Sequence, residues 1–122
     1  MGRAGSLHPA NKEGKAKTEE WKNASTIASG LRVPKPFADF LVLKVLKESK
    51  GEAIAVSDGE IVLSLKEMAE TEGVFLCPEG AAALAGAKKM VSDNKIDREE
   101  KVVLFNTGSG LKLIETLKKY LT

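Results

Sequence analysis

One unbroken apolar run lies near the C-terminal end of this chain. Residues 102–105 form an unbroken run of β-formers, the pattern expected of a short strand that is buried on both faces. Small residues follow from Thr107 to Gly110, and they would let another group approach the backbone closely. Beyond them, apolar side chains recur on one helical stripe at Leu111, Ile114, Leu117 and Leu121. The pattern predicts a strand, a tight turn and an amphipathic helix in succession.

The same analysis predicts three further helices upstream. They cover residues 37–48, from Ser57 or Asp58 to Gly73, and from Pro78 to about residue 92. Short apolar stretches at residues 52–56 and 74–76 lie between these helices and predict short strands. Alternating helices and strands favour a parallel sheet with right-handed crossovers. The predicted fold class is therefore α/β, with a small parallel sheet of two to three strands and flanking helices.

The start of the chain has a different composition. Residues 1–17 are rich in Gly, Ala, Ser and Lys, and Leu7 is the only large apolar residue after Met1. Such a segment buries too little apolar surface to offset the entropy lost on ordering. We therefore predict a mobile N-terminal leader over residues 1–17 and one globular portion over residues 18–122.

Composition excludes several classes of protein. The net charge is only +2, and basic residues alternate with acidic ones, so no basic patch predicts a nucleic-acid partner. No apolar run approaches the roughly 20 residues that a membrane span needs, and the start of the chain lacks the apolar core of a signal peptide. A single cysteine excludes an internal disulfide and fits a reducing compartment. We expect a cytoplasmic protein with no membrane partner.

The turn at residues 107–110 is the most promising site in the sequence. Free backbone N–H groups at the start of a helix favour an anion such as phosphate. The alternative interpretation is an ordinary strand-to-helix turn, because short glycine-rich turns are common and the motif is weak by itself. The residues alone leave both interpretations open.

Several spaced segments resemble one family in its own order. They are residues 26–36 (TIASGLRVPKP), 55–58 (AVSD), 73–82 (GVFLCPEGAA) and 102–112 (VVLFNTGSGLK). Together they are similar to the C-terminal part of threonine synthase, a pyridoxal-phosphate enzyme of the tryptophan-synthase-β-like fold (fold type II). The resemblance covers roughly residues 15–121. It implies a parent reaction, catalysed by a carbon–oxygen lyase, that converts O-phospho-L-homoserine and water to L-threonine and phosphate in threonine biosynthesis.

The resemblance also implies which residues contact the cofactor. The hydroxyl of Thr107 would face the pyridine nitrogen of pyridoxal phosphate, because the matching threonine of the family does so. Gly108 and Gly30 would let the backbone lie close to the cofactor, although a plain loop glycine remains the alternative at Gly30. In the family a separate, earlier glycine-rich loop holds the phosphate. The expected cofactor-binding residues are thus Thr107, Gly108 and Gly30.

Other reactive residues predict no chemistry. His8 is the only histidine and falls in the predicted leader, so a Cys/His pair with Cys77 is not expected. We interpret Cys77 as buried and structural, and Glu79 as a residue that serves a helix N-terminus. No cluster has metal-ligand spacing. We also expect no catalytic residue, because the family's lysine, which binds the cofactor aldehyde as a Schiff base after a Ser-Phe-like pair, has no counterpart in this chain.

Three hypotheses follow for the function. The first is a C-terminal fragment of a threonine synthase that is inactive alone, from a split gene, a truncated reading frame or a domain cut from a larger protein. The second is a non-catalytic subunit that complements a separately encoded N-terminal half or modulates an intact synthase. The third is a stand-alone α/β domain without catalysis. The first two predict exposed apolar surface, and hence binding of the N-terminal half or self-association.

Overall fold

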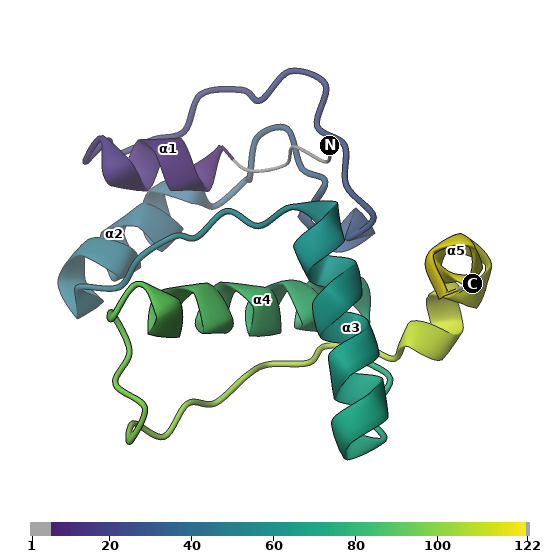
Figure 1. The fold of residues 1–122 in the computed structure, drawn as a ribbon. Coiled ribbons are helices and arrows are strands. Elements are labelled where there is room, and N and C mark those ends of the chain that lie inside the picture. Colours follow the sequence, from purple (N-terminus) through teal and green to yellow (C-terminus); the bar gives the residue numbers. More distant parts are fainter. Residues whose placement is uncertain (1–5, 122) are drawn as a thin grey trace. The chain divides into compact units, whose positions relative to one another are not determined.

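The computed structural model describes residues 6–121, and they are mainly helical (Figure 1). In chain order the elements are α1 (Leu7–Lys12), η1 (Ser29–Leu31), α2 (Asp39–Ser49), α3 (Asp58–Glu72), α4 (Pro78–Ser92), η2 (Gly110–Leu113) and α5 (Ile114–Leu121). The chain divides into two compact units. Within the described residues, the N-terminal unit comprises 6–26 and 30–55, and the C-terminal unit comprises 27–29 and 56–121.

The predicted parallel sheet is wrong. Residues 6–121 contain no β-strand, and an isolated antiparallel bridge joins Leu76 to Ser109. Residues 52–56 and 101–107 run without helix or strand, and Figure 1 shows the second segment as an extended trace beside α4. The apolar run predicted to be buried on both faces is instead exposed, with Val103 at 80% and Phe105 at 82%. A strand needs a neighbour for its backbone hydrogen bonds, and the described residues provide none along this run.

The predicted helices are confirmed, with small shifts at their ends. The helix predicted over residues 37–48 spans Asp39–Ser49, and the predicted C-terminal helix begins as the 3-10 helix η2 before it continues as α5. Helix α3 begins with a capping box. The Ser57 hydroxyl accepts from the Glu60 N–H at 3.3 Å, and the Glu60 carboxylate accepts from the Ser57 N–H at 2.6 Å. The helix ends at Gly73, whose φ of 67° is left-handed.

The C-terminal unit is held together by a core between α3 and α4. Its buried members are Ile27, Ala28, Ile61, Leu65, Leu76, Ala81, Ala82 and Leu117. The small side chains of α4 let α3 approach closely, and Leu117 brings α5 into the same core. This core fixes the start of α4, against which the predicted turn lies.

The N-terminal unit depends on buried polar contacts as well as on packing. The buried carboxylate of Asp39 accepts from the Thr18 N–H at 2.7 Å and from the Thr18 hydroxyl at 2.8 Å. The Asn11 side-chain oxygen accepts from the Ala53 N–H at 3.0 Å. These bonds join segments that are distant in sequence, so they define how this unit closes.

Part of the predicted leader is helical. Residues 1–5 lie outside the described residues, whereas α1 falls within the segment 1–17 and buries Ala10. Mobility of that segment stays a prediction.

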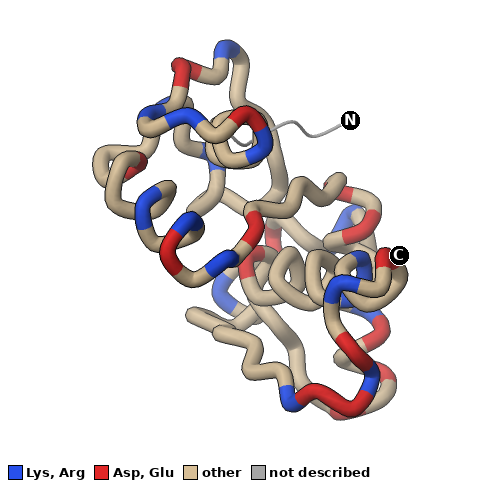
Figure 2. The backbone as a smooth tube through the Cα atoms, turned by 90° about the vertical axis from the view of Figure 1, so that its left-hand side faces the viewer, with Lys and Arg blue, Asp and Glu red and all other residues tan. Residues whose placement is uncertain are grey.

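Charges are interleaved within each unit. Figure 2 shows Lys and Arg alternating with Asp and Glu along the chain. Ion pairs within the described residues include Lys44–Glu48 at 3.8 Å, Lys88–Glu67 and Lys118–Glu115. All lie at the surface, where such pairs add little stability. Among residues 6–121, no helix has the length and apolar character to cross a membrane.

Candidate functional site

The turn at residues 106–110 lies against the segment that leads into α4. The bridge between Leu76 and Ser109 aligns the two segments, and the Gly110 N–H donates to the Phe75 carbonyl at 3.0 Å. Downstream, the Ser109 hydroxyl accepts from the Leu111 N–H at 3.3 Å and so caps η2. The turn is therefore anchored on both sides by hydrogen bonds.

Asn106, the first residue of the turn, is held in place by its side chain. Its side-chain oxygen accepts from the Cys77 N–H at 3.4 Å and from the Cys77 thiol at 3.3 Å. A β-carbon added at Gly80 would overlap that oxygen, so α4 has a glycine where Asn106 packs. Sequence analysis missed Asn106. Its one signal was a lone polar amide between an apolar run and a glycine-rich turn, and its partner lies 29 residues away.

Cys77 is buried and structural, as its type predicts. It occupies the cap position of α4, where its sulfur accepts from the Gly80 N–H at 3.4 Å while its thiol donates to Asn106. Both bonds engage the sulfur at the start of α4. Glu79 lies in the first turn of α4, the position expected for a carboxylate that serves a helix N-terminus.

The two glycines of the turn differ in how much space surrounds the position of a β-carbon. A β-carbon at Gly110 would lie 2.6 Å from the Leu76 carbonyl oxygen, so the close approach of the two segments requires glycine there. A β-carbon at Gly108 would lie 3.5 Å from the Cys77 β-carbon, an ordinary contact. Packing within the described residues therefore does not explain the glycine at 108.

Thr107 lies at the exposed tip of the turn. Its hydroxyl has no hydrogen-bond partner among residues 6–121, whereas its neighbours Asn106 and Ser109 are both engaged. A hydroxyl can donate or accept a hydrogen bond without carrying charge. The turn thus presents one uncommitted polar group on a fixed backbone.

Gly30 belongs to the other unit. It lies in η1, is exposed, and lines a cavity of about 510 Å³ in the N-terminal unit together with Leu31, Val33, Phe37 and Ile54. Thr107 and Gly108 lie side by side in the turn of the C-terminal unit. Among the described residues no group of three or more His, Cys, Asp or Glu side chains could hold a metal ion.

Comparison with known proteins identifies the family. The sequence model of the pyridoxal-phosphate dependent enzymes matches residues 3–108, which is most of the chain. The chain belongs to that family. The match contains Gly30, Thr107 and Gly108, and by its name the family depends on pyridoxal phosphate.

Threonine synthases are among the relatives of this pyridoxal-phosphate family member. The enzyme of Methanocaldococcus jannaschii is 41% identical over 92 residues, which is 75% of this chain and 23% of that protein. The enzyme of Bacillus sp. (strain ULM1) is 41% identical over 87 residues, 71% of this chain and 25% of that protein. The enzyme of Mycobacterium tuberculosis (strain H37Rv) is 36% identical over 101 residues, 83% of this chain and 28% of that protein. The chain spans about a quarter of the length of the curated relatives it matches.

The residues present fit one side of the family's cofactor. Thr107 offers a neutral hydroxyl that has no hydrogen-bond partner in the described part of the chain. A neutral hydroxyl can pair with the pyridine nitrogen of the cofactor without requiring that nitrogen to carry a proton. Gly108 keeps the backbone beside it free of a side chain. The lysine that the family uses to bind the aldehyde has no counterpart, because no phenylalanine in the sequence is followed by lysine.

Proposed function

We propose that this chain is the C-terminal part of a threonine synthase and forms one wall of its pyridoxal-phosphate site. The observation that carries the proposal is the Thr107 hydroxyl, which has no partner among residues 6–121 and stands on a turn anchored by Asn106 and Gly110. The chain is 34–41% identical to threonine synthases over about three quarters of its length. The parent reaction would convert O-phospho-L-homoserine and water to L-threonine and phosphate in the cytoplasm.

In this proposal each residue has a limited role. When bound, pyridoxal phosphate supplies the electron sink for charge that develops on an amino-acid substrate. Thr107 orients the cofactor through a hydrogen bond at the pyridine nitrogen, and its neutral hydroxyl leaves that nitrogen without a full positive charge. Gly108 admits the cofactor close to the backbone. The same role for Gly30 rests on the family resemblance alone. No residue of this chain binds the cofactor covalently, so the chain has no activity alone.

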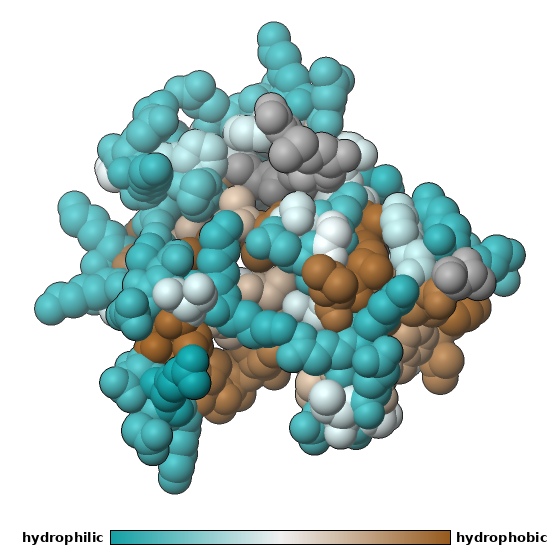
Figure 3. All heavy atoms as spheres, in the orientation of Figure 1, coloured by the Kyte–Doolittle hydropathy of each residue, from teal (hydrophilic) through white to brown (hydrophobic). Residues whose placement is uncertain are grey.

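Exposed apolar surface supports the need for a partner. Val103 and Phe105 are largely exposed on the segment that leads to the turn, and Phe37 is fully exposed in the N-terminal unit. Figure 3 shows apolar side chains at the surface of the molecule. Large apolar side chains concentrated on one segment are typical of a surface that another part of a protein covers. The proposed cover is the lysine-bearing part of the enzyme, in the same or in a separate polypeptide.

Complementation tests the proposal. The 122-residue chain is co-expressed with a Methanocaldococcus jannaschii threonine synthase that lacks the segment matching this chain, and phosphate release from O-phospho-L-homoserine is measured. We expect activity only when both polypeptides and pyridoxal phosphate are present. Thr107→Val should lower kcat by about tenfold or more, the loss expected for one strong hydrogen bond to the cofactor.

Thr116→Val is the matched control, because Thr116 is an exposed threonine of α5 outside the turn. It should leave the restored activity unchanged. Restored activity that is insensitive to Thr107→Val would contradict the role of the hydroxyl. Failure of the two polypeptides to co-purify or to restore activity would contradict the proposed partnership.

A further inference from the structure

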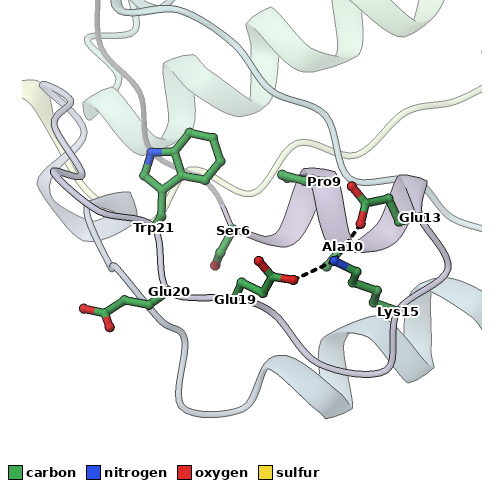
Figure 4. Close-up of a pocket in the computed structure, with 8 residues that line it drawn as sticks. All are labelled: Ser6, Pro9, Ala10, Glu13, Lys15, Glu19, Glu20 and Trp21. Carbon is green, nitrogen blue, oxygen red and sulfur yellow. Dashed lines mark hydrogen bonds and ion pairs between the residues drawn. The ribbon is translucent and has the colours of Figure 1, made fainter.

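A second cavity, of about 260 Å³, lies in the N-terminal unit (Figure 4). Its polar and aromatic lining consists of Ser6, Glu13, Lys15, Glu19, Glu20 and Trp21. None of these residues belongs to the predicted cofactor set. The cavity is large enough for a small organic molecule, and its lining includes one side chain that is buried without a partner.

That side chain is Ser6. It is only 4% exposed, and its hydroxyl has no hydrogen-bond partner among residues 6–121. Serine at the cap position of a helix commonly accepts from a backbone N–H, but here the side chain makes no such bond to α1. Figure 4 shows Ser6 and Glu19 among the side chains that line the cavity. A buried hydroxyl without a partner is costly, so a ligand that pairs with it gains affinity.

The charges around the cavity favour a cation. Lys15 lies 2.7 Å from the carboxylate of Glu13 and 2.7 Å from that of Glu19, so one ammonium faces two carboxylates. These contacts lower the pKa of Glu19, because Lys15 donates a hydrogen bond to its carboxylate and attracts its charge. Glu20 adds a further negative charge and points away from that pair in Figure 4. A bound anion would meet an ammonium that is already doubly paired.

The aromatic lining suits the same class of ligand. Trp21 is half-buried at the cavity, and an indole ring attracts ammonium groups through its negative face. Pro9 and Ala10 of α1 add apolar surface for an alkyl stem. A hydroxyl acceptor, a carboxylate and an indole ring together match a primary ammonium on a short alkyl chain.

We propose that this cavity binds a small primary alkylammonium cation. The ammonium donates to the Ser6 hydroxyl oxygen and to the Glu19 carboxylate, and the alkyl stem packs against Trp21. The site is separate from the proposed cofactor wall and needs no covalent or redox step.

Fluorescence of the purified 122-residue chain tests the proposal directly. Trp21 is the only tryptophan, so fluorescence excited selectively at tryptophan reports on this cavity. The probe is n-butylammonium chloride, titrated at constant ionic strength, with n-butanol and sodium butyrate as matched neutral and anionic probes. We expect a saturable change with the ammonium and none with the other two.

Variants separate the contributions of the lining. Ser6→Ala and Glu19→Gln should each weaken binding by about tenfold, as expected when a ligand charge loses a hydrogen-bond partner. Lys15→Met should tighten binding, because it removes the competing internal cation. Glu70→Gln, a carboxylate of α3 outside the cavity, should leave binding unchanged.

Three results would overturn the proposal. They are the absence of a saturable response to n-butylammonium, an equal response to n-butanol, and weaker binding by the Lys15→Met variant. If Ser6→Ala fails to fold, Glu19→Gln and Lys15→Met still decide the question, because both side chains are at the surface and face solvent.

Discussion

The side-chain oxygen of Asn106 accepts hydrogen bonds from both the backbone N–H and the thiol of Cys77. This contact joins the start of the turn to the start of α4. Cys77 also caps α4. The position of Thr107 therefore depends on the start of a helix that lies 29 residues before Asn106 in the sequence. The turn is thus positioned by tertiary contacts and not by its own glycines alone.

Removal of the Asn106 side chain should loosen this anchor. Asn106→Ala deletes two hydrogen bonds and leaves the buried Cys77 N–H without its acceptor, so we expect the free energy of unfolding to fall by about 1–2 kcal/mol. Urea denaturation of the variant and the wild type measures the loss. Thr107→Ala is the neighbouring control and should change stability by less than about 0.5 kcal/mol, since its side chain is exposed. Equal losses in the two variants would contradict the anchoring role.

The two glycines of the turn should respond differently to an added methyl group. Gly110→Ala places a β-carbon 2.6 Å from the Leu76 carbonyl oxygen, and we expect a loss of about 1–3 kcal/mol from overpacking. Gly108→Ala meets only ordinary contacts with Cys77, so its stability should change by less than about 0.5 kcal/mol. Thermal unfolding of the matched pair is the measurement. In the complementation assay, Gly108→Ala should still lower activity, because the proposed approach to the cofactor is blocked.

Stability should depend on pH through Asp39. The Thr18 N–H holds the pKa of this carboxyl below its ordinary value, with help from the Thr18 hydroxyl, the Phe40 N–H and the charge of Lys35. A folded-state pKa below the unfolded value of about 4 means that the carboxylate stabilises the fold above that pH. The contribution is lost as the pH falls through the folded-state pKa.

The variant Asp39→Asn isolates that contribution. We expect it to be less stable than the wild type at neutral pH, and the difference should shrink as the pH falls to about 2. Urea denaturation across this range is the measurement. Thr18→Val removes only the hydroxyl and keeps the N–H, so it should show a smaller loss at neutral pH. If the difference in free energy of unfolding between Asp39→Asn and the wild type does not vary with pH, ionisation of the Asp39 carboxylate does not cause that difference.

The exposed apolar residues should contribute to partner binding and not to the stability of the isolated chain. The double variant Val103→Ser, Phe105→Ser changes side chains that are at least 80% exposed, so the thermal midpoint of the chain alone should stay the same. The same variant should bind less of a hydrophobic dye and should fail to restore activity with the lysine-bearing part. Leu63→Ser, an exposed change on α3, is the control and should retain complementation. Normal complementation by the double variant would mean that the partner does not cover this segment.

Local signals in the sequence were sufficient for the helices. Ser57 caps α3 as one of the two predicted starts, Gly73 ends that helix, and Pro78 opens α4. Each of these rules depends on residues within one or two turns of helix, so no tertiary information was needed. The burial of Cys77 followed in the same way from its residue type.

Features that depend on distant contacts were not predictable. The run at residues 102–105 has strand-forming residues, but a sheet needs a partner segment, and the described chain provides none for it. Asn106 packs against Cys77, which is 29 residues away in the sequence, and Ser6 is buried without a hydrogen-bond partner among residues 6–121. Neither property can be read from the neighbouring residues. The roles of Thr107, Gly108 and Gly30 came from family resemblance, and they remain predictions that complementation tests.

Turnover by the purified 122-residue chain alone tests the central claim most directly. The chain is incubated with pyridoxal phosphate and O-phospho-L-homoserine, and release of phosphate and formation of L-threonine are followed over time. A chain that supplies only one wall of the cofactor site should give no more product than pyridoxal phosphate free in solution. Sustained production of L-threonine above that level, proportional to the concentration of the chain, would contradict the account.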